Sequence, residues 1–169
     1  MDLKQVQGDG FDFALAVPNV KSMNEEQLIA AARQAALLAY APYSRFSVGC
    51  AIESSDGRVA TGVNVENACY RLGVCAEQSA LSAAHLAFGL ATVTRIAVAG
   101  GDGSGESLAG GIVCTPCGGC RQAILEAAQL GGRDIEIICS SGNGKSVERH
   151  RISSLIPHGF GPANLDDAG

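Results

Sequence analysis

The sequence predicts a single α/β domain, a three-layer α/β/α sandwich around a mixed, mostly parallel five-stranded sheet. Three observations support this fold class. Apolar residues recur at helical spacing in three segments, and short apolar runs typical of strands lie between those segments. The length of 169 residues suits one domain. Because 47% of the residues are hydrophobic and only 17% are charged, the chain can bury a core, which excludes wholesale disorder.

The first predicted helix spans residues 24–39. Ser22, followed three residues later by Glu25, has the spacing of a capping box, and the apolar residues after it recur every three or four positions. Residues 1–21 show no sustained period. We therefore expect an irregular extension over residues 1–21 and one domain over residues 22–165.

The remaining elements alternate between strands and helices. In chain order they are a β-hairpin at residues 48–52 and 59–63, a helix at 75–88, a strand at 96–99, a Gly-rich loop at 100–111, a helix at 117–130 and a strand at 135–139. Helices between strands are typical of parallel pairing, so the hairpin is expected to form an antiparallel edge.

Charge and hydropathy exclude several classes of protein. The net charge is −5 and the basic residues are scattered, which argues against a nucleic-acid partner. The longest apolar stretch, residues 35–41, is too short for a membrane helix, and the first residues lack the pattern of a signal peptide. We therefore expect a cytoplasmic protein with no membrane partner. In that reducing compartment, the odd number of seven cysteines favours metal ligands and buried thiols over disulfides.

Cysteines at the starts of two predicted helices form the strongest local pattern. Cys117 and Cys120 follow Pro116 at the start of one helix, and Cys75 and Glu77 open another. The partial positive charge at a helix start stabilises thiolates, so both positions favour deprotonated ligands. Three protein ligands leave the fourth position of a tetrahedral Zn²⁺ open, as in a catalytic site.

Several sequence blocks, in order, resemble one family. They are Tyr43-Ser44-Arg45-Phe46-Ser47-Val48-Gly49, Asn64-Val65-Glu66-Asn67-Ala68-Cys69-Tyr70, Cys75-Ala76-Glu77, Pro116-Cys117-Gly118-Gly119-Cys120-Arg121-Gln122 and Phe160-Gly161-Pro162. Together they closely resemble the zinc-dependent cytidine deaminases that act on free nucleosides, over about residues 24–165.

The resemblance implies a role for each matching residue. It implies that Cys75, Cys117 and Cys120 bind Zn²⁺, that Glu77 shuttles protons, that Asn64 and Glu66 hydrogen-bond the ribose, that Phe46 packs against the pyrimidine, and that Ala76 belongs to the substrate-binding set. In the small tetrameric members, residues matching Tyr70 and Phe160 come from neighbouring subunits. The implied reaction is hydrolysis of cytidine and 2′-deoxycytidine to the uridines and ammonia, in a homotetramer with shared active sites.

The chain departs from the family pattern at Gln78. Members with three cysteine ligands commonly carry Arg after the glutamate, whereas Gln78 is neutral. Three thiolates on Zn²⁺ leave a negative charge that a poorly solvated site must offset. We therefore expect Arg121, directly after Cys120, to reach the ligand sulfurs in place of that Arg.

Two alternatives remain open from the sequence. A structural zinc or iron–sulfur module would recruit Cys114 or Cys139 as a further ligand. A relative acting on a modified cytosine nucleoside, such as an antibiotic of the blasticidin type, would share the same motifs. The cysteines outside the motif ligands, namely Cys50, Cys69, Cys114 and Cys139, are otherwise expected to be small buried hydrophobic residues.

Overall fold

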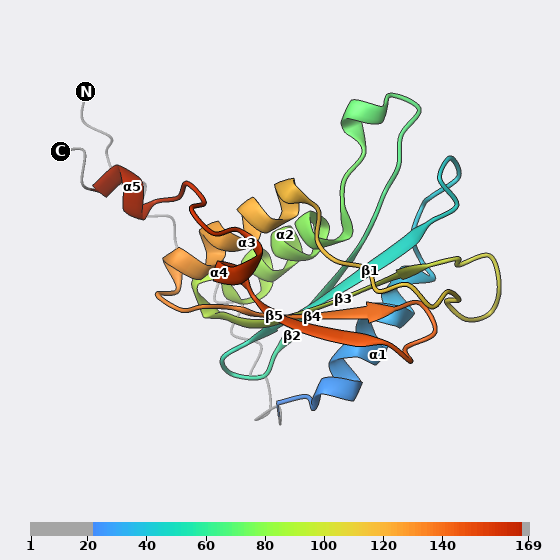
Figure 1. The fold of residues 1–169 in the computed structure, drawn as a ribbon, viewed down its shortest axis with the longest axis horizontal. Helices are drawn as coiled ribbons and strands as arrows, with labels where there is room; N and C mark the ends of the chain where they lie inside the picture. Colours follow the sequence, from blue (N-terminus) through green and yellow to red (C-terminus); the bar gives the residue numbers. More distant parts are fainter. Residues whose placement is uncertain (1–21, 167–169) are drawn as a thin grey trace, which may run out of the picture.

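A computed structural model describes residues 22–166, which form a five-stranded sheet between two layers of helices (Figure 1). The elements are α1 (Glu25–Ala36), β1 (Ser47–Ser54), β2 (Val59–Val63), η1 (Tyr70–Leu72), α2 (Ala76–Phe88), η2 (Leu90–Thr92), β3 (Val93–Gly101), α3 (Gly118–Leu130), β4 (Glu136–Ser141), β5 (Val147–Arg151), α4 (Ile152–Leu155) and α5 (Ala163–Asp166). The α/β class, the five strands and the three layers agree with the sequence prediction. The division at residue 22 stays a prediction, since residues 1–21 lie outside the described residues.

The prediction of a mostly parallel sheet was wrong. The strand order is β2-β1-β3-β4-β5, and only the β3/β4 pair is parallel. Helices do connect strands of like direction: α2 links β2 to β3, and α3 links β3 to β4. However, β1 lies between β2 and β3 and runs antiparallel to both. The fifth strand, Val147–Arg151, is a charged edge strand with no apolar run to reveal it.

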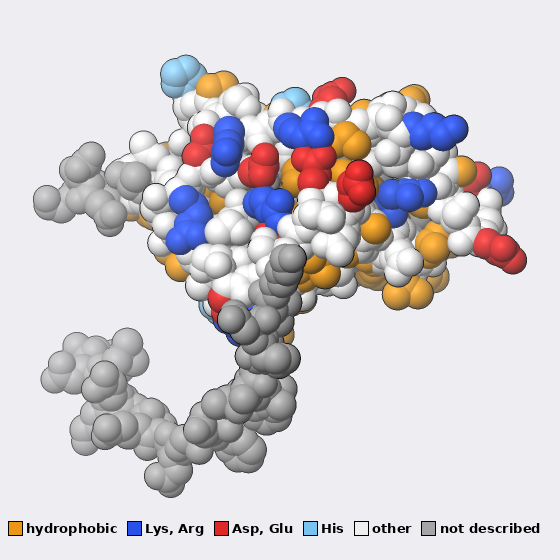
Figure 2. Space-filling model, turned by 90° about the horizontal axis from the view of Figure 1, so that it is seen from below, with side chains coloured by type: hydrophobic (Ala, Val, Ile, Leu, Met, Phe, Trp, Pro, Cys, Tyr) orange, Lys and Arg blue, Asp and Glu red, His pale blue; other side chains and the backbone are white. Residues whose placement is uncertain are grey.

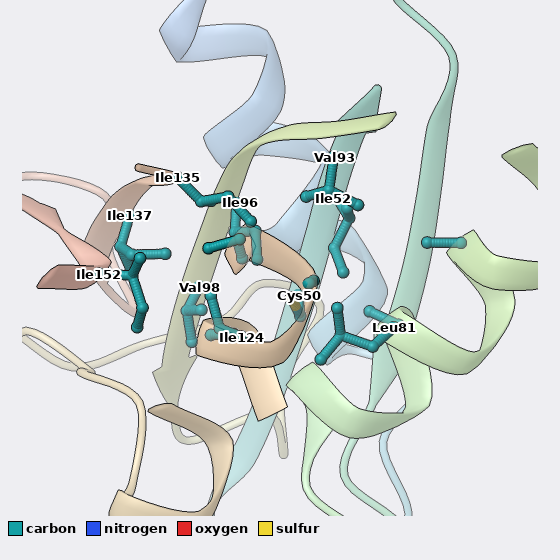
Figure 3. Close-up of a cluster of buried hydrophobic side chains, with 14 of the residues drawn as sticks. Cys50, Ile52, Leu81, Val93, Ile96, Val98, Ile124, Ile135, Ile137 and Ile152 are labelled. Carbon is teal, nitrogen blue, oxygen red and sulfur yellow. The ribbon is translucent and has the colours of Figure 1, made fainter. Parts of the chain in front are cut away.

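Helix α1 covers one face of the sheet, while α2 and α3 cover the other. Two strand glycines allow this close packing. A Cβ at Gly49 would lie 2.0 Å from the Ala32 carbonyl oxygen in α1, and one at Gly62 would lie 2.2 Å from the Ala80 nitrogen in α2. The core between the sheet and the α2/α3 layer, shown in Figure 3, includes Ile52, Leu81, Val98, Ile124 and Ile137. This packing fixes where α2 and α3 begin.

The N-terminus of α1 is capped differently from the prediction. Asn24 and Gln27 form the capping box, because the Asn24 side chain accepts from the Gln27 amide and the Gln27 side chain accepts from the Asn24 amide. The Ser22 hydroxyl instead donates to the Glu53 carboxylate of β1 (2.9 Å). The helix also ends at Ala36 rather than at residue 39.

A buried ion pair ties the start of α1 to the sheet. The Glu53 carboxylate is 2% exposed and accepts hydrogen bonds from Ser22, from the Met23 amide (2.8 Å) and from Arg95 Nε (2.7 Å). On the surface seen in Figure 2, Lys and Arg side chains lie interspersed with Asp and Glu. Arg149 on β5 forms a surface ion pair with Glu25 of α1. The Glu53 pair is far less solvated than the Glu25 pair.

Glu53→Gln is expected to lower the free energy of unfolding by about 3 kcal/mol, because it leaves the Arg95 guanidinium without its counter-charge in a nearly dry site. Urea denaturation measures this change. Glu25→Gln, which breaks the more exposed pair, is the matched control and should cost about 1 kcal/mol or less. Equal losses for the two variants would contradict the assigned difference in burial.

Within residues 22–166, no helix has the length and apolar character to cross a membrane.

Candidate metal centre and substrate site

Three cysteine sulfurs converge where α2 and α3 begin. Cys75 is the N-cap residue of α2, Cys117 is the N-cap residue of α3, and Cys120 lies in the first turn of α3. The three Sγ atoms lie within 4.8 Å of one another, and those of Cys75 and Cys117 are 3.9 Å apart. Residues separated by more than 40 positions therefore form one cluster, as the sequence predicted.

The cluster fits a zinc ion. Tetrahedral zinc with bonds of about 2.3 Å to sulfur holds its sulfur ligands about 3.8 Å apart. The 3.9 Å between the Cys75 and Cys117 sulfurs matches that value, and the Cys120 sulfur lies within 4.8 Å of both. Within residues 22–166, Cys75, Cys117 and Cys120 form the one His, Cys, Asp and Glu group whose ligand atoms are this close, and neither Cys114 nor Cys139 belongs to it. Three thiolates without a fourth protein ligand are typical of a catalytic rather than a structural zinc.

The three thiols differ in how readily they ionise. Burial raises the pKa of Cys75 and of Cys120 above the ordinary thiol value. Burial is also the largest single effect on Cys117, but the backbone amides of Cys120 and Gly119, together with the thiols of Cys120 and Cys75, outweigh it and lower the Cys117 pKa. These amides are unpaired donors of the first α3 turn, so the helix start itself favours the thiolate.

Glu77 lies beside the sulfur cluster and is almost completely buried. It occupies the first turn of α2, next to the buried Ala76, and is 4% exposed. Burial raises the pKa of its carboxyl group, and the adjacent Cys120 thiol partly offsets that effect. A carboxyl group with a raised pKa near a metal site is suited to accept and return a proton.

Asn64 fixes the backbone around Phe46. The Asn64 Nδ2 donates to the Phe46 carbonyl (2.9 Å), and its Oδ1 accepts from the Val48 amide (2.8 Å). Residues 64–66 are extended, since Val65 pairs with Val74 on one side and Tyr40 bonds to both Asn64 and Glu66 on the other. The structure thus brings Asn64 and the half-exposed Phe46 together.

Glu66 lies on the same segment and lines an open cavity. Its Oε2 accepts from the amides of Tyr43 (2.9 Å) and Ser44 (3.2 Å), and the hydrogen bonds from Ser44 and Tyr43 lower its pKa. The cavity has a volume of about 340 Å³ and is also lined by Asn67, Tyr70 and Gly73. An ionised carboxylate at the cavity wall can accept hydrogen bonds from hydroxyl groups.

Two aromatic residues of the predicted site point outward in this chain. Tyr70 is 80% exposed, and its ring meets that of Tyr43 edge to face at 6.0 Å. Phe160 is 62% exposed. Both rings are therefore accessible to another molecule.

The structure contradicts the role expected for Arg121. Its Nε donates to the Pro116 carbonyl (2.8 Å) and its Nη1 to the Leu155 carbonyl (3.1 Å), so within residues 22–166 its guanidinium bonds backbone carbonyls instead of the ligand sulfurs. Successive residues on a helix do not face the same way, and Arg121 follows Cys120 directly.

Gln78 lines a groove between α2 and α3 that has a volume of about 620 Å³.

Sequence reasoning missed the packing under Phe46. A Cβ at Gly100 would lie 2.8 Å from Cys114 Sγ and 2.9 Å from Phe46 Cε1. Burial raises the pKa of the Cys114 thiol to about 11, and the Glu77 and Cys75 charges add to the effect. Cys114 therefore packs against the core, as expected, and also lies next to the site, whereas Cys69 is exposed, contrary to expectation. The glycine at the end of the predicted strand was the one available signal.

Comparisons with known proteins agree with the site. Residues 22–130 match the family model of the cytidine and deoxycytidylate deaminase zinc-binding region. The cytidine deaminase of Mycobacterium tuberculosis is 43% identical over 136 residues, covering 80% of this chain and 86% of the relative. The cytidine deaminase of Halalkalibacterium halodurans is 36% identical over 145 residues, covering 86% of this chain and 100% of the relative.

Solved structures give the same result. The crystal structure of cytidine deaminase from Burkholderia pseudomallei matches with a TM-score of 0.69 and 38% identity, covering 82% of this chain and all of that one. The crystal structure of cytidine deaminase from Mycobacterium tuberculosis matches with a TM-score of 0.64 and 37% identity, covering 83% of this chain and 99% of that one. Sequence, site geometry and fold therefore agree that this chain belongs to the cytidine and deoxycytidylate deaminase family.

Proposed function

We propose that this protein is a zinc-dependent hydrolase that converts cytidine and 2′-deoxycytidine to uridine and 2′-deoxyuridine with release of ammonia. One observation carries the proposal: a buried carboxyl group, Glu77, lies beside three thiols that fit zinc and leave one position open. A structural zinc or iron–sulfur module has no use for that carboxyl group and needs a fourth ligand. The named relatives are cytidine deaminases.

Cys75, Cys117 and Cys120 would hold the ion. Bound zinc supplies Lewis acidity that makes water a nucleophile near neutral pH. Glu77 accepts the proton of the attacking water and transfers it to N3 of the base, which makes C4 electrophilic. Glu77 then takes the proton of the hydroxyl group on C4 and transfers it to the amino group, so that the C4–N bond breaks, ammonia departs, the C4 carbonyl of the uridine forms and the carboxylate is restored. Because burial raises the pKa of Glu77, this one carboxyl group can both accept and deliver protons.

The nucleoside would lie between the cluster and the cavity beside Glu66. Phe46 would pack against the pyrimidine, with the buried Ala76 beside it, and the carboxylate of Glu66 would accept from ribose hydroxyls. Asn64 would contribute to ribose binding while its carboxamide holds the Phe46 and Val48 backbone.

We also propose a homotetramer in which Tyr70 and Phe160 complete neighbouring sites. The exposure of both rings supports it. A second support is the apolar groove on the outer side of α2 and α3, where Leu86 is 88% exposed and would be covered by another subunit. The cytoplasmic location remains a prediction.

Gly100→Val is expected to lower kcat/KM for cytidine by roughly tenfold or more, because the added side chain would displace Phe46 or Cys114 at a cost of about 1–3 kcal/mol. Steady-state kinetics on cytidine measure the effect. Gly105→Val, in a more open part of the following loop, is the control and should retain activity. Unchanged kinetics in Gly100→Val would show that Phe46 is not held over Gly100.

The direct test of the function is turnover by the purified zinc-loaded protein. We expect loss of the cytosine absorbance on adding cytidine, with one ammonia released per nucleoside. Absence of turnover with cytidine and deoxycytidine would overturn the proposal. Turnover of a blasticidin-type nucleoside alone would favour the alternative substrate.

A further inference from the structure

The chain after β5 lies along α3 and is held by the turn of that helix that carries Cys120. Arg121 Nη1 donates to the Leu155 carbonyl (3.1 Å), and Gln122 Nε2 donates to the Phe160 carbonyl (2.5 Å). Both donors immediately follow Cys120 in sequence. One turn of α3 thus contributes a sulfur to the metal cluster on one side and holds the C-terminal segment on the other.

The backbone on both sides of Phe160 is pressed against α3. A Cβ at Gly159 would lie 2.5 Å from Leu125 Cδ2, and a Cβ at Gly161 would lie 2.3 Å from Gln129 Oε1. A side chain at either position would have to displace the end of an α3 side chain. The Phe160 carbonyl, anchored by Gln122, lies between these two contacts, yet its side chain is 62% exposed.

This arrangement holds the main chain firmly and directs the aromatic side chain outward. Packing of the chain's own core does not explain it, because the ring is not in that core. A side chain held in its bound position loses less conformational freedom on association than a mobile one. The contacts of Gln122, Leu125 and Gln129 with residues 159–161, here called the Phe160 clamp, are therefore suited to present the ring to another molecule.

We propose that Gln122 is a positioning residue for the active site of a neighbouring subunit, which it serves by fixing the backbone of Phe160. The inference rests on the proposed function, in which the Phe160 ring completes a neighbour's site. Its sequence position, two residues after Cys120, would suggest a role in the chain's own metal centre instead. The hydrogen bond of the Gln122 side chain to the Phe160 carbonyl connects Gln122 to the ring that would enter the neighbouring subunit's site.

Arg121 is a less clean probe of the same clamp. Its Nε bonds the Pro116 carbonyl, which directly precedes the ligand Cys117, so its loss would disturb the chain's own metal loop as well. Gln122 has one described side-chain bond, and that bond goes to Phe160. Gln122→Met keeps the length of the side chain and removes its donor.

The test uses hybrid oligomers. Gln122→Met alone should retain one zinc per chain and raise KM for cytidine by about 2- to 10-fold, the factor that corresponds to one lost hydrogen bond. Gln34→Met, on the exposed side of α1, is the control and should leave KM unchanged. Gln122→Met subunits are then co-expressed with Glu77→Gln subunits under two affinity tags, and the doubly tagged oligomers are purified.

Every competent site in these hybrids contains Met at position 122, since the other subunits lack the carboxylate. With Gln122 acting on a neighbour, about half of those sites receive an intact Phe160 clamp, and a component with the wild-type KM appears. With Gln122 acting in its own site, KM stays at the value of the Gln122→Met homo-oligomer, which would overturn the proposal. Wild-type kinetics in that homo-oligomer would overturn it too.

Two further measurements keep the outcome decisive. If Gln122→Met subunits fail to assemble, Gln122→Glu, which keeps the shape and also lacks the donor, takes their place with the same two outcomes. Phe160→Ala subunits, mixed in the same way, test the shared site itself. Failure of Phe160→Ala to be rescued overturns both the shared site and the role of Gln122, whereas an inactive wild-type protein overturns the proposed function.

Discussion

Glu77→Gln is expected to keep its zinc and to lose turnover by a factor of about 10² to 10⁴, the usual contribution of a general acid–base group. The substitution preserves the shape of a side chain that is 4% exposed and is not a metal ligand, so the sulfur cluster should persist. The carboxamide can neither accept the water proton nor deliver it to N3. Zinc content by atomic emission and kcat for cytidine measure the two halves of this result.

The matched control for Glu77→Gln is Glu26→Gln, which makes the same chemical change on an exposed residue of α1. Its zinc content and turnover should equal those of the wild type. Wild-type turnover in Glu77→Gln would remove Glu77 from the mechanism. Loss of zinc in that variant would show that the carboxylate acts as a ligand.

Cys75→Ala should lose both zinc and activity. Removing one of three ligands should weaken metal binding by more than the roughly 10- to 100-fold caused by losing an outer hydrogen-bond partner. Because the bound metal would link the start of α2 to the start of α3, the variant should also unfold at a lower temperature than the zinc-loaded wild type. Zinc titration with a chromogenic chelator measures the affinity.

Cys69→Ala is the control for the loss of a thiol. Cys69 is an exposed cysteine six residues before Cys75 and lies outside the sulfur cluster. Its zinc affinity and activity should be unchanged. A Cys75→Ala protein that keeps one tightly bound zinc and full activity would show that the metal is held elsewhere.

The metal centre could be predicted from sequence because its determinants are local. Cys117 and Cys120 are three residues apart at a helix start, and Cys75 and Glu77 open the other helix, so each pair could be recognised locally, while the family resemblance implied that the two pairs share one metal site. The resemblance added Asn64, Glu66 and Phe46, and the structure brings Asn64 and Phe46 into direct contact.

Features that depend on distant contacts escaped prediction. Local pattern shows that helices connect strands, but it does not show that β1 lies between β2 and β3, which is what makes the sheet mostly antiparallel. The Ser22 hydroxyl bonds Glu53 in another element, so Asn24 caps α1 in its place. The partner of Arg121 in α4 was likewise invisible in the sequence around Cys120.

X-ray absorption at the zinc edge of the purified protein tests the central claim most directly, because it counts the ligands of the ion. The three-thiolate cluster predicts three sulfur atoms at about 2.3 Å and one oxygen or nitrogen at about 2.0 Å, which is the open position of a catalytic zinc. Four sulfur neighbours would contradict the account, since Cys114 or Cys139 would then close a structural site.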